Sequence, residues 1–245
     1  MMEKDKLNFN LSVAGHSFAI HTLYTDTYDL CEEYINDGPA EEEIRISVSD
    51  IEEEQNEAIK QGTNARCAYL ETLAVYRKIA KSILQYDVFL MHGAVVAFED
   101  SAYMFTAASG TGKTTHVQKW LENLKGTYVL NGDKPLIKIT DNDVIACGTP
   151  WCGKEHLGKN EMIPLRAIVL MERGDNNDIH EITFGQAFAG LLQQTFTPDK
   201  PELMKKTLKL LSLLKGKTKF YKFVFNNMKD DCFDVAYNAL IGDNR

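Results

Sequence analysis

The 245-residue sequence predicts an α/β fold with a mixed sheet, built around a phosphate-binding loop (P-loop) and preceded by a small α+β layer. Three observations predict it. A strand-like run, a glycine loop and an amphipathic helix follow one another between residues 102 and 124. Short apolar runs joined by polar turns, at 88–107 and 136–147, add antiparallel strands to the sheet. Residues 1–62 alternate in strand fashion around short helical segments.

The composition is that of a folded chain, and its charge disfavours polyanionic partners. The hydrophobic content of 44% supports a substantial core, and the net charge of −8 argues against a nucleic-acid or anionic membrane surface. The first residues lack the apolar core of a signal peptide, and no apolar run is long enough to cross a bilayer. We therefore expect a cytoplasmic protein without a nucleic-acid or membrane partner. Five cysteines without a Cys-x-x-Cys pair predict reduced thiols.

The N-terminal elements can be predicted in order. Alternating residues predict a hairpin from strands at 7–13 and 18–23, followed by a helix at 26–35, a strand at 44–48 and a charged helix at 50–60. Gly62-Thr63-Asn64 predicts a boundary between an accessory region, 1–62, and a nucleotide-binding domain, 63–245. An apolar stripe then predicts a helix of about twenty residues, which leads into a buried strand at 88–98 that is interrupted by His92-Gly93.

The loop after the strand at 102–107 carries the clearest motif, a small residue, four free positions and then Gly-Lys-Thr. Its glycines let backbone N–H groups face a polyanion, Lys113 would reach the outer phosphates, and Thr114 would offer its hydroxyl to Mg²⁺. The alternative is a glycine-rich turn that binds nothing, although such a turn does not need the Lys-Thr pair. The residues predicted to bind nucleotide phosphates are Ala108, Ser109, Gly110, Thr111, Gly112, Lys113, Thr114 and Thr115.

A second candidate site follows the helix at 115–124 and a short strand at 127–130. Asp133 stands at the end of that strand, where a carboxylate beside a P-loop is the usual second ligand of Mg²⁺; a turn aspartate before Pro135 is the alternative. A hairpin at 136–147 leads to the loop 148–158, which is too rich in functional groups to be only a connection. The remaining strands are predicted at 167–171, 179–183 and 220–225, and the remaining helices at 184–194, 201–214 and 230–241.

These motifs together resemble a known family. His92-Gly93 before the loop ASGTGKT, and an acidic strand end after it, are similar to the catalytic domain of the HPr serine kinase/phosphorylase family, which shares its fold with ATP-dependent phosphoenolpyruvate carboxykinases. The strings SGTGKTTH, NGDKP, GTPWCGK and PLRAIVLMERG more closely resemble a group of smaller HPr-kinase-like proteins. The resemblance covers roughly residues 65 to 240, and only the P-loop within it is sharply defined.

The resemblance implies a P-loop kinase-type mixed sheet, ATP with Mg²⁺, and phosphoryl transfer to a serine hydroxyl. By position, Thr114 and Asp133 correspond to the metal ligands, Lys113 to the catalytic lysine and His92 to a strand histidine near the phosphates. The chain departs from the family twice. Gly132 stands where the family has a first aspartate, the proposed proton acceptor. The family also has an arginine-glycine signature in a later substrate loop, and this chain has only Lys154, in GTPWCGK, in its place. We therefore expect Gly132→Asp to raise turnover, unless the backbone angle at this glycine disfavours aspartate.

Three functions follow from this reading. The first is an ATP-dependent kinase that phosphorylates a serine or other hydroxyl of a small protein, peptide or metabolite, its phosphoacceptor. The second, favoured by Gly132, is a nucleotide-binding regulatory module or pseudokinase. The third, a carboxykinase-like enzyme, ranks lowest because the chain lacks an obvious arginine cluster for two carboxylates. A homo-oligomer is one alternative for assembly, since HPr kinases form hexamers, but the N-terminal region looks unlike theirs.

Overall fold

The computed structural model describes residues 5–60, 62–226 and 228–242. Residue contacts divide the chain into two units, Met1–Gln85 and Tyr86–Arg245, so the boundary predicted after residue 62 falls inside the first unit. None of the helices in the described ranges is long and apolar enough to span a bilayer. The five cysteines, all within these ranges, are free thiols.

The first unit contains a three-stranded sheet in the order β1-β2-β3. The hairpin predicted from the alternating pattern is confirmed, since β1 and β2 are antiparallel and join through Ala14 and Gly15, whose φ angles are 53° and 79°. β3 pairs with β2 in parallel. The elements are η1 (Asp5–Leu7), β1 (Asn8–Val13), β2 (His16–His21), α1 (Asp26–Cys31), η2 (Glu32–Tyr34), β3 (Glu42–Arg45), α2 (Val48–Lys60), α3 (Cys67–Ser82) and η3 (Ile83–Tyr86).

A buried carboxylate explains why α3 belongs to the first unit. Glu71 on α3 is fully buried, and its oxygens accept hydrogen bonds from the backbone N–H groups of Leu23 and Tyr24, at 2.6 and 3.1 Å. The hydroxyl of Thr27 on α1 donates to the same carboxylate. Because removing one partner of a buried charge is costly, these bonds fix α3 to the segment that enters α1.

The second unit is built on a nine-stranded mixed sheet. Seven strands follow the order β4-β8-β9-β10-β6-β5-β7, while β12 pairs with β10, and β11 with β12. β10 first pairs antiparallel with β9 and then runs parallel between β6 and β12. The strands are β4 (Val88–Leu90), β5 (Ala94–Phe98), β6 (Ser101–Thr106), β7 (Tyr128–Asn131), β8 (Leu136–Ile139), β9 (Val144–Cys147), β10 (Met162–Arg173), β11 (Asp178–Ile182) and β12 (Lys219–Phe225).

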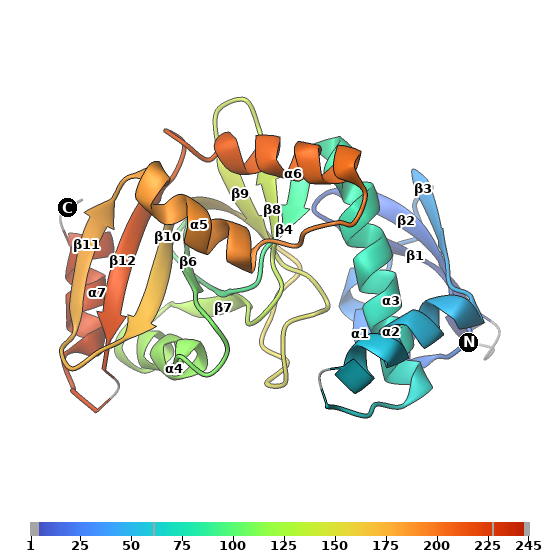
Figure 1. The fold of residues 1–245 in the computed structure, drawn as a ribbon, viewed down its shortest axis with the longest axis horizontal. Helices are drawn as coiled ribbons and strands as arrows, with labels where there is room; N and C mark the ends of the chain where they lie inside the picture. Colours follow the sequence, from blue (N-terminus) through green and yellow to red (C-terminus); the bar gives the residue numbers. More distant parts are fainter. Residues whose placement is uncertain (1–4, 61, 227, 243–245) are drawn as a thin grey trace. The chain divides into compact units, whose positions relative to one another are not determined.

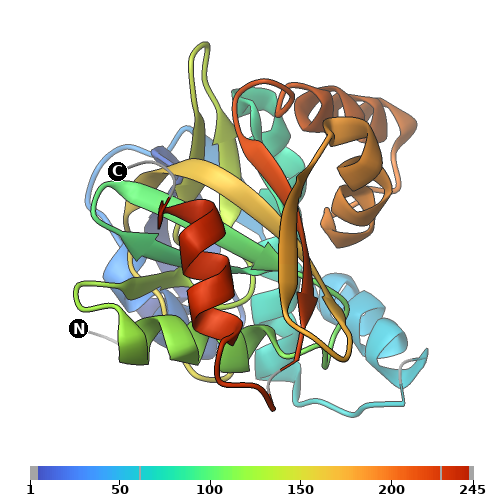
Figure 2. The same ribbon diagram turned by 90° about the vertical axis from the view of Figure 1, so that its left-hand side faces the viewer.

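Helices cover both faces of this sheet (Figures 1 and 2). On one face α4 (Lys113–Asn123) and α7 (Cys232–Leu240) pack over an aromatic core centred on the fully buried Trp120. On the other face α5 (Phe184–Gln194) contacts β10 and β12, and α6 (Pro201–Ser212) lies against β4. The order strand β6, loop, helix α4 is the one that a P-loop requires.

Candidate functional site

The predicted P-loop lies between the end of β6 at Thr106 and the start of α4 at Lys113. Gly110 and Gly112 adopt φ angles of 78° and 115°, which L-residues rarely adopt. A Cβ atom at Gly112 would also stand 2.7 Å from the ring of Phe225. These positions therefore require glycine, and they bend the backbone so that it enters α4 without side chains over the helix N-terminus.

Lys113 lies across the loop. Its Nζ donates hydrogen bonds to the carbonyl oxygens of Ala107 and Ala108, at 2.9 and 3.4 Å. Burial lowers the pKa of Lys113, whereas the charge of Asp133 raises it. The P-loop lysine and the carboxylate at the end of β7 are thus close enough to interact, although 20 positions separate them in the sequence.

Arg173 is a residue of this site that sequence analysis did not identify. It ends β10, and its guanidinium donates to the carbonyl oxygens of Gly110 and Thr111, at 2.6 and 3.3 Å. It is exposed, so it holds the loop from the solvent side. An arginine directly after a buried parallel strand, within the string MERG, was the available signal.

Asp133 follows β7 and forms two ion pairs. Its oxygens lie 2.7 Å from Lys134 Nζ and 3.2 Å from His92 Nε2. Burial alone would raise the pKa of Asp133, but the hydrogen bonds from His92 and Lys134 outweigh burial and lower the pKa to about 2. The carboxylate is therefore ionised at neutral pH, as a metal ligand must be.

His92, between β4 and β5, connects Asp133 to the end of α5. Its Nδ1 lies 2.8 Å from Oε1 of Gln194, and its backbone N–H donates to the carbonyl of the same residue at 2.7 Å. Both ring nitrogens face oxygen atoms, so the ring bridges Gln194 and Asp133. Gln194 was missed because it is 102 residues away from His92, and no local pattern reports such a contact.

The loop 148–158 folds back onto the end of β7. Asn131 is fully buried, its Nδ2 donates to both oxygens of Thr149, and its Oδ1 accepts from the N–H groups of Asp133 and Lys134. Gly132 donates its N–H to the carbonyl of Leu157 at 3.1 Å. All hydrogen-bonding atoms of the Asn131 amide are engaged, so this side chain holds the end of β7 to Thr149 and to the backbone of the following turn.

The backbone of the same loop covers Gly132. A Cβ atom added there would stand 2.5 Å from the carbonyl oxygen of Cys152, and Gly132 does not adopt a positive φ. The obstacle to a side chain is this carbonyl and not the backbone angle. The expectation that Gly132→Asp simply restores a carboxylate is therefore corrected, because the loop already occupies that space.

The tip of the loop is open to solvent. Lys154, Glu155 and His156 are exposed, and His156 has a φ of 51°. A Cβ built on Gly153 would stand 3.3 Å from Cβ of Asp133 and 3.7 Å from Oε2 of Glu155. The tip therefore brings a second carboxylate toward Asp133, while the role of Lys154 stays a prediction.

The residues present fit a nucleotide with Mg²⁺. Thr114 and Thr115 are exposed in the first turn of α4, and Asp133 supplies an ionised carboxylate. Among the described residues no group of three or more His, Cys, Asp or Glu side chains could hold a metal ion. Mg²⁺ typically combines one or two protein oxygens with phosphate oxygens and water, and Thr114 and Asp133 would supply the protein oxygens.

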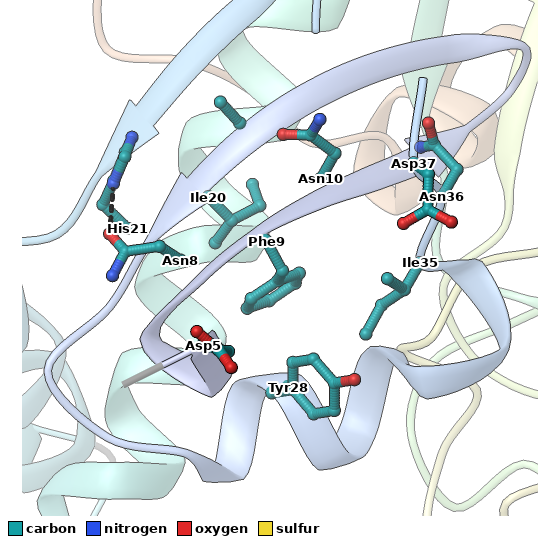
Figure 3. A pocket seen from close by; sticks show the side chains of 11 residues that line it. Asp5, Asn8, Phe9, Asn10, Ile20, His21, Tyr28, Ile35, Asn36 and Asp37 are labelled. Atoms are coloured by element: carbon teal, nitrogen blue, oxygen red, sulfur yellow. Dashed lines mark hydrogen bonds between the residues drawn. The ribbon is translucent and has the colours of Figure 1, made fainter. Parts of the chain in front are cut away.

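A separate cavity of about 520 Å³ lies in the first unit, around Phe9 and Tyr28 (Figure 3). The two rings meet edge to face at 5.3 Å, and Asp5 and Asp37 stand on the rim. Much of its polar lining is used within the protein. His21 Nδ1 lies 2.6 Å from Oδ1 of Asn8, and other rim amides bond to the backbone. We assign no function to this cavity.

Comparison with known proteins shows similarity to solved structures. No family model matches the chain, and no curated protein matches it in sequence. Among solved structures, the chain is similar to the Hpr(Ser) kinase/phosphatase from Coxiella burnetii, with a TM-score of 0.39 and 8% identity, over 64% of this chain and 99% of that chain. A similarity this distant does not decide the function, which has to be inferred from the site itself.

Proposed function

We propose that the protein is an ATP-dependent phosphotransferase that transfers the γ-phosphoryl group to a serine or other hydroxyl of a small protein, peptide or metabolite. The observation that supports this most is that Lys113, at the start of α4, lies near enough to Asp133, which follows β7, for the charge of the carboxylate to raise the pKa of the lysine. A structural turn needs neither a lysine across its carbonyls nor an ionised, half-buried carboxylate opposite.

Each residue has a distinct task in this proposal. The N–H groups of 108–112 and of the first turn of α4 bind the phosphates, and Lys113 leaves the carbonyls of Ala107 and Ala108 to neutralise the outer ones. Thr114 and Asp133 hold Mg²⁺, which neutralises phosphate charge when bound. If Asp133 bound Mg²⁺, the ion pair between Lys134 and Asp133 would have to break, and the ammonium group of Lys134 would be free to face the phosphates.

The proton of the acceptor hydroxyl needs a base other than Asp133. A carboxylate with a pKa of about 2 is a weak base, because proton transfer is most efficient when the pKa lies near the working pH. The open tip of the loop 148–158 offers Glu155 and His156 for this task. His92, with its ring held between Gln194 and Asp133, keeps the carboxylate in position.

A nucleotide-binding regulatory module is the second candidate. The observation in its favour is the covering of Gly132 by the carbonyl of Cys152, which excludes a carboxylate at the position of the family's proton acceptor. Such a protein would bind ATP and Mg²⁺ through the same loop and Asp133, but it would not consume ATP.

Nucleotide binding is the first test. Lys113→Ala should weaken MgATP binding by on the order of 100-fold, because it removes charge-assisted bonds to the outer phosphates. Calorimetric titration measures this. The matched control is Lys125→Ala, an exposed lysine beyond α4 that should leave the affinity unchanged. Equal affinity in the wild type and Lys113→Ala would remove the loop from the nucleotide site.

Turnover separates the two candidates. ADP release should increase when serine-containing peptides or hydroxyl metabolites are added, and mass spectrometry should find the acceptor heavier by one phosphoryl group. Tight MgATP binding without ADP release for any acceptor would favour the regulatory module. ADP release that depends on oxaloacetate would instead indicate the carboxykinase-like alternative.

A further inference from the structure

The Tyr86–Arg245 unit contains another cavity, the basic cavity, at the end of the sheet opposite to the P-loop. Its volume is about 670 Å³, and it is bounded by the first residues of β6 and β12, by Arg166 and Ala167 of β10, and by the loop 215–218. β10 and β12 run toward the end of the sheet where α4 lies, so the cavity is at their starting end (Figure 1). The six residues of β6 separate it from the P-loop by about 20 Å.

A β-bulge places an arginine at this cavity. Leu165 is opposite Ala102 and Ala167 is opposite Tyr103, so Arg166 is an extra residue in the pairing of β10 with β6. Bulges are rare between parallel strands, and they redirect a side chain. Arg166 is exposed, and its Nε donates to Oγ of Ser101 at 3.5 Å, the limit of a hydrogen bond. The described part of the chain gives it no ion pair.

The cavity is cationic although the chain as a whole is acidic. Arg166, Lys215, Lys217 and Lys219 line it, against the single carboxylate of Glu181. Lys219 lies 3.8 Å from Glu181 and is partly neutralised. Lys217 donates to two backbone carbonyls, which satisfy its hydrogen bonds but do not neutralise its charge. A positive excess in a chain with a net charge of −8 is therefore concentrated at one place.

Aromatic rings form the walls between these cations. Tyr103 and Tyr221 lie toward the core under α4 and α7, and Phe184 and Phe220, with ring centroids 5.7 Å apart, lie on the α5 side. Burial raises the pKa of the Tyr103 hydroxyl, while the hydrogen bond with Ser101 and the charge of Arg166 lower it, so the guanidinium lies near enough to act on this hydroxyl electrostatically. A flat ring and an anionic group would find complementary surfaces side by side.

We propose that this cavity is a second ligand site, which binds a small organic anion consisting of a flat ring that carries a phosphate or carboxylate group. Arg166 and Lys215 bind the anionic group, and the aromatic walls contact the ring. The site is separate from the P-loop, and the proposal does not depend on the phosphotransferase activity proposed above.

Calorimetric titration of the whole chain tests the proposal. Phenyl phosphate and benzoate represent the two anionic groups on the same ring, and the tighter of the two identifies the group that the site prefers. Inorganic phosphate lacks the ring, and benzyl alcohol lacks the charge. We expect the better ring anion to bind about tenfold more tightly than either fragment, because both contacts contribute.

Variants locate the binding. Arg166→Gln should lower the affinity for the ring anion about tenfold, and Lys215→Gln should also lower it. The melting temperatures should stay unchanged, because both side chains are exposed. Lys125→Gln is the matched surface control. Lys113→Ala should leave the affinity unchanged. The proposal is overturned if no ring anion binds, or if inorganic phosphate binds as tightly as the better ring anion. It is also overturned if neither Arg166→Gln nor Lys215→Gln weakens binding of the ring anion, or if Lys113→Ala abolishes that binding.

Discussion

Asp133 carries the most strongly depressed carboxylate pKa among the described residues. Its hydrogen bonds with His92 and Lys134 exist only in the folded state, so the unfolded chain, with a pKa near 3.8, takes up a proton first as the pH falls. The stabilisation is therefore complete above about pH 4 and is lost as the pH falls through about 2. After discounting for partial exposure, it amounts to about 1–2 kcal/mol.

We predict that Asp133→Asn lowers the free energy of unfolding by this amount at pH 7, and that the difference from the wild type shrinks between pH 4 and pH 2. Chemical denaturation across this range measures it. The same variant should also impair Mg²⁺-dependent nucleotide binding, unlike Asp141→Asn and Asp143→Asn, whose exposed side chains lie in the β8–β9 turn. Identical Mg²⁺ titrations for all three variants would show that Asp133 is not the metal ligand.

At the scale of elements, the contact between the loop 148–158 and the end of β7 decides which substitutions Gly132 tolerates. We predict that Gly132→Ala lowers the free energy of unfolding by about 1–3 kcal/mol, because its Cβ would meet the Cys152 carbonyl and force the loop outward. Thermal and urea unfolding measure the loss.

The control for this prediction is Gly185→Ala in the first turn of α5. Its nearest neighbour would be 4.0 Å away, and its φ is not positive, so the change should be neutral or stabilising by less than about 1 kcal/mol. Gly132→Asp should lose stability as Gly132→Ala does, or more. A stable Gly132→Asp protein with faster turnover would show that the loop moves aside easily and would reinstate the expectation from the sequence.

Local patterns predicted most of these elements, and contacts between distant segments account for the rest. The hairpin of β8 and β9 was predicted almost residue for residue, since alternation and the Asp141-Asn142-Asp143 turn are both local signals. β10 begins at Met162 and not at 167, because its first residues pair with β9. The predicted strand at 88–98 is split, and β4 pairs with β8 whereas β5 pairs with β6 and β7.

The same distinction holds for the site. The strand, loop and helix pattern around Lys113 and the strand before Asp133 are local signals, so both positions could be predicted, whereas the order β6-β5-β7 could not. Gln194 and the carbonyl of Cys152 reach the site through tertiary contacts that leave no trace in their own neighbourhoods. The boundary predicted after residue 62 and the division by contacts after Gln85 differ for the same reason, since the buried carboxylate of Glu71 gives no sign in the sequence of the backbone that it binds.

At the scale of the whole molecule, a buried histidine in the aromatic core links stability to pH. His116 is fully buried, its Nε2 accepts from Nε1 of Trp120 at 2.9 Å, and its Nδ1 has no hydrogen-bond partner in the described part of the chain. Burial lowers the pKa of His116 to about 3. The unfolded chain therefore binds a proton below about pH 6.5 while the folded chain does not, and stability falls as the pH falls toward 3.

We predict that His116→Gln, which keeps an acceptor for Trp120 but does not titrate, flattens the dependence of unfolding free energy on pH between 6.5 and 3. The effect in the wild type is up to roughly 4 kcal/mol. Urea unfolding at several pH values measures it, with the exposed His180→Gln as the control. Parallel pH profiles for wild type and His116→Gln would mean that the imidazole takes up a proton inside the core.

β10 also fixes a distance. Arg166 near its start lines the basic cavity, and Arg173 at its end holds the P-loop. Hydrogen bonds along both edges keep the strand extended, so the two arginines are held about 23 Å apart. An anion built on a single flat ring is too short to bridge that spacing. Two anions can therefore occupy the protein at the same time, one at each end of a single strand, without competing for the same space.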